Sequence, residues 1–453
     1  MNKLLFLFLI LYTPLFTEEL VVTLRTEADL LPTYLGKIES KKSDFSGEYL
    51  HALSQVLEYD LANNGALTLI SDNDKRAFRA VINQESYDSD VSFHRCKEAK
   101  MIYWIKLKNE GKALSCKIIS VPEQNSTTIV GLMLSGDIAK DRRMIHTLHD
   151  RIHEVLFQKP GIASTRILYT LRSSPTHSEI YEADWDGYNI KQLTHEKNYI
   201  VTPVFAPQGT LVYVSYKIGQ PKIYYATLHD GKSKRLTPLK GNQMTPQVSL
   251  DGSRVAFACD TTGTSDIFIQ DFHPVTGSLS KPRQIFASKG ATSASPVFSP
   301  DASRIAFVSN KDGSPKIYVM DVPKEGASIK QLKPQLISKK MRENSAPSWS
   351  PDGKKIAYSA KAQGNRQIWV YDIETQSETQ LTNGTGDKEN PVWASNSLHL
   401  LFNATTGKET ELFVINIHQK KAVQITHGSG EKRFPYWEKS DKIMPLPLAS
   451  SGQ

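Results

Sequence analysis

The stretch that decides the fold spans residues Pro347–Ser359 and reads PSWSPDGKKIAYS. A proline is tolerated where a strand begins, because its missing N–H is not needed there, and Trp349 then supplies a large apolar body. Residues Ser350–Gly353 have the chemistry of a tight turn, since proline fixes φ, aspartate bonds its own backbone and glycine accepts a positive φ. Residues Ile356–Tyr358 read as a second strand, so the stretch predicts a β-hairpin.

The hairpin recurs along the chain at intervals of 43 to 51 residues. Each copy is followed by a third predicted strand, such as Ile368–Asp372, and by a fourth, such as Thr379–Thr382. Four short strands in a unit of about 45 residues are typical of one β-propeller blade. The first prolines of the copies are Pro203, Pro246, Pro296, Pro347, Pro391 and Pro435.

The two ends of this array predict how the ring closes. The first unit begins with a second strand at Arg166–Thr170 and has no innermost strand, whereas the last copy, Phe434–Trp437, is only an innermost strand. We therefore expect a six-bladed β-propeller closed by the C-terminal strand, an arrangement that leaves no sheet edge open.

A smaller α/β unit is predicted in front of the ring. Ser46 is a candidate N-cap for a helix that runs to about Asn63, and a second helix is expected at residues 143–158. Strands are expected at residues 101–107, 113–121 and 127–134. The predicted fold is thus mainly β with an α/β N-terminal domain. Its predicted parts are a signal peptide at 1–17, the α/β domain at 18–160, the six-bladed propeller at 161–446 and a tail at 447–453.

The N-terminal residues have the pattern of an export signal. A short polar and basic start is followed by an apolar run at Leu4–Leu11, which is too short to span a bilayer and fits a secretory leader. We expect cleavage after Thr17 and no lipid anchor, because no cysteine lies at that junction. Three cysteines are too few for a disulfide scaffold. A Cys96–Cys116 bridge and a pair of buried thiols remain the two alternatives for the N-terminal domain.

The charge pattern argues against a nucleic-acid partner. The net charge is +8, but the basic residues are scattered and form no dense block, so we expect a solvated basic surface.

Catalytic and metal sites are only weakly indicated. An exported propeller hydrolase or lyase acting on carbohydrate or peptide is the alternative function, yet the chain has no G-x-S-x-G elbow. His146, His149 and His153 share a helix face at a spacing that can seat a metal, and His195 and His427 follow fourth strands. Ordinary packing and solvated loops explain these histidines as well. We therefore expect no catalytic residue, no metal and no cofactor.

Small residues precede each motif proline. Because these segments connect one blade to the next, they converge on one face around the central tunnel, where a protein loop could approach the backbone. The predicted partner-binding residues of this mouth are Thr202, Thr245, Ser295, Ala346, Asn390 and Phe434.

Two further segments narrow the ring to a family. The segment Arg143-x-x-His146-x-x-x-Asp150, followed by Gly161-Ile162 and Thr165-Arg166-Ile167, resembles the junction between the two domains of TolB proteins. The segment Asp184-x-Asp186-Gly187-Tyr188-Asn189 resembles the first blade of the same family, and the likeness covers nearly the whole chain. The chain departs from the family pattern at residues 28–33 and in the second and fifth motif copies.

This resemblance implies a non-enzymatic periplasmic component of the Tol–Pal envelope system. It implies binding of the Pal lipoprotein at the propeller mouth, and of TolA by an N-terminal arm that comprises Glu18, Glu19, Leu20, Val21 and Val22. It also implies a monomer that is peripheral to membranes through its partners only and that supports outer-membrane integrity and envelope constriction at cell division.

Overall fold

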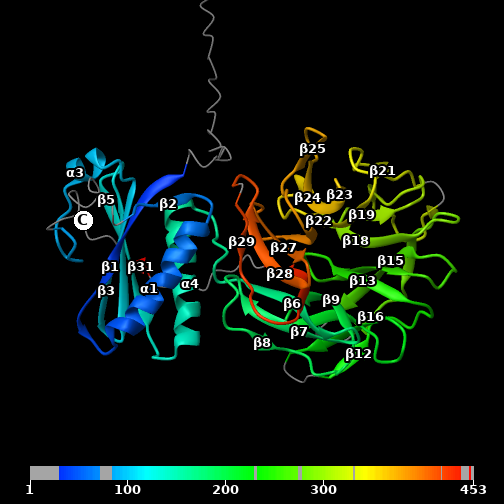
Figure 1. Cartoon of the computed structure of the whole chain (residues 1–453), viewed down its shortest axis with the longest axis horizontal. Coiled ribbons are helices and arrows are strands. Elements are labelled where there is room, and N and C mark those ends of the chain that lie inside the picture. Colours follow the sequence, from blue (N-terminus) through cyan, green and yellow to red (C-terminus); the bar gives the residue numbers. More distant parts are fainter. Residues whose placement is uncertain are drawn as a thin grey trace, which may run out of the picture.

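The chain folds into a smaller N-terminal unit beside a larger ring of sheets (Figure 1). The computed structural model describes residues 30–71, 84–228, 232–273, 278–329, 332–419, 421–439 and 448–449. The predicted signal peptide and the arm Glu18–Val22 lie outside the described residues.

The N-terminal unit consists of a six-stranded sheet with two long helices packed on it. The apolar sides of the helices, including Leu53 and Leu57 of the first and Ile145 and Leu148 of the last, are buried in one core with Ile105 and Ile129 of the sheet. The elements in chain order are β1 (Leu31–Ser43), α1 (Gly47–Asn63), β2 (Leu67–Leu69), α3 (Phe93–Glu98), β3 (Tyr103–Gly111), β4 (Ala113–Ser120), β5 (Asn125–Met133) and α4 (Ile138–Phe157).

Capping residues fix where the two long helices begin. The Ser46 hydroxyl accepts a hydrogen bond from the Tyr49 amide at 3.2 Å, which confirms the predicted start of α1. The Asp137 carboxylate accepts from the Ala139 amide at 3.0 Å, so α4 begins at Ile138 and not at the expected Arg143. The long strand β1, parallel to both β2 and β3, was not predicted.

The larger unit is a six-bladed β-propeller, as predicted. The first blade has the strand order β30-β6-β7-β8, so the C-terminal strand is its innermost strand. That blade is built from β6 (Arg166–Ser174), β7 (His177–Asp184), β8 (Lys191–Gln192) and β30 (Glu431–Trp437). The second blade has β9 (Ile200–Ala206), β10 (Thr210–Ser215), β11 (Lys222–Thr227) and β12 (Ser233–Arg235).

The remaining blades repeat this order from the inside outward. The third blade comprises β13 (Gln243–Val248), β14 (Arg254–Cys259), β15 (Asp266–His273), β16 (Ser278–Leu279) and β17 (Arg283–Phe286). The fourth comprises β18 (Ser293–Phe298), β19 (Arg304–Ser309), β20 (Lys316–Asp321) and β21 (Gln335–Leu336), and the fifth comprises β22 (Asn344–Trp349), β23 (Lys355–Ala362), β24 (Asn365–Asp372) and β25 (Ser377–Gln380). The sixth comprises β26 (Asp387–Trp393), β27 (His399–Thr406), β28 (Glu409–Asn416) and β29 (Val423–Gln424).

The repeated motif is structural. In the fifth blade the Ser350 hydroxyl donates to the Asp352 carboxylate at 2.6 Å, and Gly353 has a φ of +74° in the turn. Trp349 is buried between blades, and the equivalent Trp393 donates to the Ser348 carbonyl of the neighbouring blade at 3.1 Å. The motif residues therefore turn the hairpin of the fifth blade, and the tryptophan of the sixth blade joins it to the fifth.

The segment predicted as a tail contributes one more strand. Residues Leu448–Ala449 form β31, which pairs antiparallel with β5 of the N-terminal sheet, with Leu448 opposite Ile129. Strand β31 accordingly lies with the N-terminal unit in Figure 1.

Two simpler findings concern the cysteines and the helices. Cys96, Cys116 and Cys259 are free and buried, so the alternative of a Cys96–Cys116 bridge is not realised. Among the described residues, no helix combines the length and the apolar character needed to cross a membrane.

Candidate partner-binding site

The six predicted mouth residues lie together around one cavity. Each occupies the equivalent position on the innermost strand of its blade, and all six line a tunnel-like space of about 120 Å³ on the propeller axis. The structure therefore brings together every residue that the repeat placed there. The six are Thr202, Thr245, Ser295, Ala346, Asn390 and Phe434.

These six residues share an unusual backbone conformation. Their φ angles fall between +49° and +53°, in the left-handed region that non-glycine residues seldom adopt. In every blade the ladder between the innermost strand and its neighbour shifts register at this point, as between Val201 and Val204 of β9. Such a bulge bends the strand and re-aims its side chains. The mouth is thus built from six copies of one strained bend.

Some polar side chains of the mouth have hydrogen-bond partners, and one does not. The Thr245 hydroxyl accepts from the Ser295 amide at 3.1 Å, and the Asn390 amide donates to Asn403 at 2.8 Å. The Thr202 hydroxyl is buried and has no hydrogen-bond partner among the described residues. A buried hydroxyl without a hydrogen-bond partner is energetically unfavourable.

A chain of alternating charges follows the rim of the mouth across three blades. Glu389 lies 3.4 Å from Arg366 on one side and 3.7 Å from Arg433 on the other. Arg433 pairs with Glu431 at 2.7 Å, and Glu431 lies 3.5 Å from Arg172. These ion pairs hold the innermost strands of the sixth and first blades in place, and sequence reasoning gave no signal for them.

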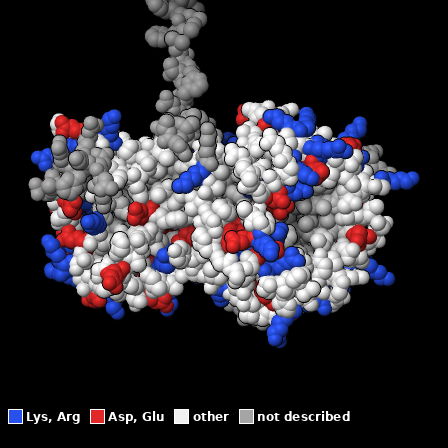
Figure 2. Space-filling view, in the orientation of Figure 1, with Lys and Arg blue, Asp and Glu red and all other residues white. Residues whose placement is uncertain are grey.

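A larger polar hollow of about 680 Å³ opens beside this rim, between the sixth and first blades. Arg172, Lys408, Glu409, His427 and Glu431 line it. Figure 2 shows that basic and acidic side chains are interspersed over the visible face, without a dense block of basic residues, as the sequence predicted. The hollow adds to the polar surface on the mouth side of the propeller.

The junction between the two units lies at the opposite end of the blades. Strands β7 and β28 run away from the mouth, and the residues at or just beyond their far ends, Asp184, Trp185 and Asn416, face the N-terminal unit. His399, at the far end of β27, donates from Nε2 to the Asn63 carbonyl of α1 at 2.9 Å, because a carbonyl oxygen can only accept. Mouth and junction therefore occupy separate ends of the propeller.

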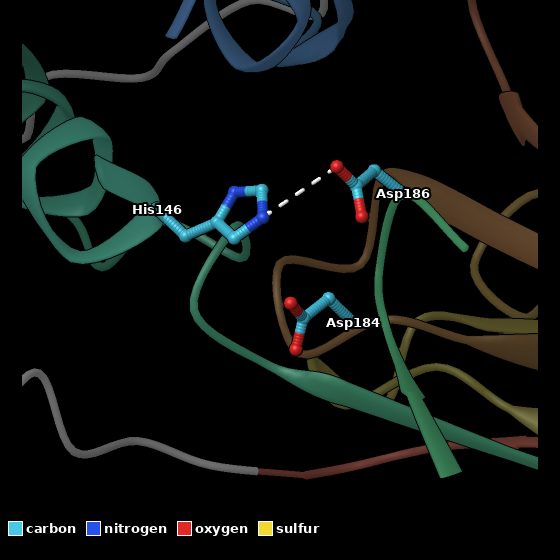
Figure 3. Close-up of side chains that lie close together, drawn as sticks. All are labelled: His146, Asp184 and Asp186. Carbon is cyan, nitrogen blue, oxygen red and sulfur yellow. Dashed lines mark ion pairs between the residues drawn. The ribbon is translucent and has the colours of Figure 1, made fainter. Parts of the chain in front are cut away.

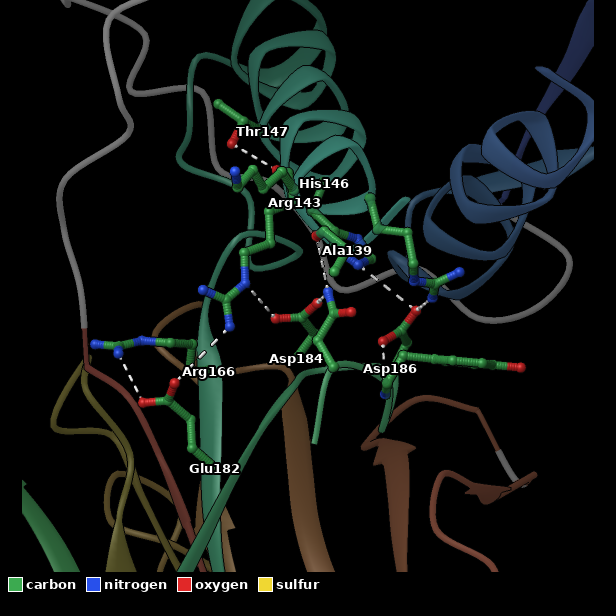
Figure 4. A network of polar contacts seen from close by, with 12 residues as sticks. Ala139, Arg143, His146, Thr147, Arg166, Glu182, Asp184 and Asp186 are labelled. Carbon is green, nitrogen blue, oxygen red and sulfur yellow. Dashed lines mark hydrogen bonds and ion pairs between the residues drawn. The ribbon is translucent and has the colours of Figure 1, made fainter. Parts of the chain in front are cut away.

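Helix α4 contributes a row of charged side chains to this junction (Figure 4). Arg143 donates to Asp184 at 3.1 Å, Arg142 pairs with Asp186, and Asn189 of the blade donates to the Ala139 carbonyl at 3.1 Å. Because the two carboxylates are buried, these ion pairs hold the blade against the helix, although Arg143 itself is half exposed.

A buried histidine lies in the middle of the junction. His146 Nδ1 is 2.8 Å from the Asp60 carboxylate of α1, and the other Asp60 oxygen accepts from the Trp185 indole at 2.9 Å. Burial of the ring opposes its protonation, but the neighbouring Asp60 carboxylate outweighs this and raises the pKa of His146 to about 9. Burial raises the pKa of Asp186, whose carboxylate lies 3.6 Å from His146 Nε2.

The same histidine belongs to the one cluster, within the described part of the chain, whose geometry could hold a metal ion. His146, Asp184 and Asp186 offer ligand atoms within 4.8 Å of one another (Figure 3). Both carboxylates are already paired with arginines, so a cation here would have to displace two guanidinium groups. The cluster is better described as an ionic junction.

The other histidines considered from the sequence make local contacts. His149 contacts Asp150 and Asn64, and His153 Nδ1 is 3.0 Å from the Lys159 carbonyl. His195 and His427 each accept through Nδ1 from the side-chain amide of a glutamine in their own blade, at 3.0 and 3.1 Å. The spacing on α4 thus reflects domain packing.

Comparisons with known proteins agree on one family. A family model described as the TolB beta propeller domain matches residues 153–441. A protein named Protein TolB homolog from Protochlamydia amoebophila is 44% identical over 386 residues, which cover 82% of this chain and 82% of that protein. A homolog of the same name from Chlamydia trachomatis serovar L2 is 36% identical over 397 residues, which cover 86% of this chain and 84% of that protein. The crystal structure of TolB from Acinetobacter baumannii has the same fold, with a TM-score of 0.73 at 23% identity, over 90% of this chain and 96% of that one.

Proposed function

Because this chain belongs to the TolB family, we propose that it is a periplasmic protein–protein adaptor of the Tol–Pal envelope complex. The Pal lipoprotein docks at the propeller mouth, and TolA binds the N-terminal arm Glu18–Val22, which lies outside the described residues. The chain acts by binding and carries out no catalysis. Through these contacts it supports outer-membrane integrity and envelope constriction at cell division.

The observation that carries the proposal is the ring of six left-handed residues at the mouth. Backbone strain of about 1–2 kcal/mol for each such residue persists only where the surrounding structure holds it in place, and strained backbone gathers at ligand-binding positions. Five of the six side chains are small, so a partner loop can approach the backbone closely.

The arrangement of the surfaces also favours an adaptor. The mouth and the N-terminal unit lie at opposite ends of the blades, so a partner at the mouth leaves the N-terminal unit accessible to a second one. The polar hollow lined by Arg172, Lys408 and Glu409 widens the docking face on the mouth side.

The mouth proposal is tested by blocking the opening. Ala346→Arg places a long side chain over the tunnel, and Ser303→Arg places the same side chain on an exposed turn at the far end of the neighbouring blade. With protein purified after export, we expect Ala346→Arg to weaken Pal binding at least tenfold, measured by calorimetry, which corresponds to about 1.4 kcal/mol. Ser303→Arg should bind within twofold of the wild type. Equal affinity of both variants, or no binding by the wild type, would refute docking at the mouth.

The arm proposal is tested by removing it. A chain that lacks residues 18–30 should lose TolA binding and keep its propeller fold, because β1 begins at Leu31. If the arm and the mouth are coupled, the same deletion changes Pal affinity, and Pal changes TolA affinity by the same factor. Unchanged TolA binding would exclude the arm, and unchanged Pal affinity would exclude the coupling.

A further inference from the structure

A single lysine lines the end of the propeller tunnel that is far from the mouth. Lys439 follows Trp437, the last residue of the innermost strand β30, and borders the axial cavity together with the six mouth residues. It also borders a second hollow lined by Val248, Phe298 and Trp349, the residues at the far ends of other innermost strands. Its side chain therefore lies at the junction-side end of the tunnel.

The surroundings of Lys439 contain no compensating charge. The axial cavity is otherwise lined by prolines and by small, apolar or uncharged polar side chains, as far as the described residues go. Tyr436 is the other ionisable group of the lining, and burial raises its pKa, so the phenol stays neutral. The neighbouring Glu438 carboxylate is held by Arg166 at 2.7 and 3.1 Å. Among the described residues the Lys439 ammonium group has no hydrogen bond or ion pair.

An ammonium group in this position is unfavourably solvated. Burial lowers the pKa of Lys439 to about 8, and no neighbouring anion opposes that effect. A charged group without a partner in a partly dry cavity gains free energy from any anion that reaches it. The lysine is still mostly protonated at neutral pH, so the cavity holds one available positive charge.

We propose that Lys439 makes the propeller tunnel a binding site for a carboxylate group that enters from the mouth. The carboxylate belongs to an Asp or Glu side chain of the protein partner, and this part of the inference rests on the proposed function. A cavity of about 120 Å³ has room for a few water-sized groups, each with a share of about 30 Å³, and so for one carboxylate but for no folded element.

The depth of the site sets what can reach it. Lys439 lies five positions after Phe434 at the mouth, three of them in β30 and two beyond it, so the two residues are at most about 16 Å apart along the tunnel. The lysine stem covers part of that distance, and a glutamate at the tip of an inserted loop covers the rest. The six left-handed residues of the mouth surround the opening through which that glutamate side chain would pass.

The anion site is tested first with small probes on the whole protein. Reductive methylation with ¹³C keeps the charge of each lysine and gives each a resolved NMR signal. The signal that disappears in Lys439→Gln should titrate with a midpoint near 8, well below the value of about 10.4 for a lysine in a model peptide. Lys354, which is exposed, serves as the control position. Acetate or phosphate, added at constant ionic strength, should raise that midpoint by about one unit, which reports tenfold tighter anion binding to the protonated form. No shift with either anion would overturn the site.

The source of the carboxylate is tested with Pal. Lys439→Gln should bind Pal about tenfold more weakly than the wild type, Lys439→Arg should restore most of the affinity, and Lys354→Gln should change nothing. Acetate could still shift the Lys439 signal while Pal binds the wild type and Lys439→Gln equally. The tunnel would then bind a free anion, and the proposal that the partner supplies the carboxylate would be refuted. If acetate shifts the signal and Pal binds neither protein, the anion site stands and the proposed function fails.

Discussion

Arg166 and Glu438 lie 272 residues apart in the chain and form a two-pronged ion pair, in which the guanidinium donates to both carboxylate oxygens at 3.1 and 2.7 Å. Arg166 begins β6, and Glu438 follows β30, so the pair joins the first strand of the propeller to the last one. Trp437 strengthens the same closure, because its indole donates to the Thr165 hydroxyl at 2.7 Å. The ring is thus fastened by side chains as well as by the strand ladder.

Glu438→Gln should weaken this closure. It removes the charge from a half-buried, two-pronged contact while keeping the shape of the side chain, and we expect the free energy of unfolding to fall by about 1–3 kcal/mol. Urea denaturation measures the change. Glu374→Gln, on an exposed turn of the fifth blade, should stay within about 0.5 kcal/mol of the wild type. Equal effects of the two substitutions would show that the ladder alone closes the ring.

His146 should make stability depend on pH in the alkaline range. Its pKa is about 9 in the folded protein and about 6.5 when unfolded, so its contribution is complete below pH 6.5 and is lost as the pH rises through 9. The wild type should lose about 1–3 kcal/mol between pH 6 and pH 9 that His146→Gln does not lose. Urea denaturation at a series of pH values measures this, with the exposed His94→Gln as the control. Parallel profiles for wild type and His146→Gln would contradict the assignment.

Gly187→Ala should separate two neighbouring blades. A Cβ at this position would overlap the backbone carbonyl of Ile425 in the sixth blade, and φ is +86°. Gly263 has a similar φ of +99° but open space around it, so Gly263→Ala measures the cost of the backbone conformation alone. We expect Gly187→Ala to be less stable than Gly263→Ala by about 1–3 kcal/mol, in thermal or urea unfolding. Similar stabilities would mean that the blades accommodate the methyl group.

Deletion of residues 440–453 should expose one edge of the N-terminal sheet. Strand β31 pairs with Thr128 and Ile129 of β5, and its loss leaves the backbone groups on that edge open to water. Hydrogen exchange at residues 127–130 should become at least tenfold faster, while the central strand β4 keeps its protection. Unchanged exchange in β5 would show that the pairing adds no protection. Lys439 is retained in this variant, so the tunnel is not altered.

The propeller was predictable because its determinants are local and repeated. Proline, aspartate and glycine at fixed positions of Pro347–Ser359 specify a hairpin whatever surrounds it, and six copies fix the ring. The positions of Thr202 and its five equivalents followed from the same repeat. Their left-handed backbone did not, because none of them is a glycine and other residues seldom adopt that conformation.

Features that depend on distant contacts were missed. Strand β1 reads LPTYLGKIESKKS, a largely polar stretch that becomes a strand only between β2 and β3. The helix motif pointed to His146, but its partner Asp60 lies 86 residues earlier in the chain. Lys439 follows the last motif copy and belongs to no motif, so only the closed ring shows that it lies at the tunnel.

The pairing of β31 with β5 also sets a limit on how the two units can move. The chain leaves the N-terminal unit after α4 and returns to it at Leu448, so two connections, and not one, join the unit to the propeller. The returning connection from Lys439 has a maximum reach of about 30 Å when fully extended. Two connections at separate points restrict the relative motion of the units more than a single linker would. A partner that pulls on the N-terminal unit would therefore load both connections together with the ion pairs between α4 and the first blade.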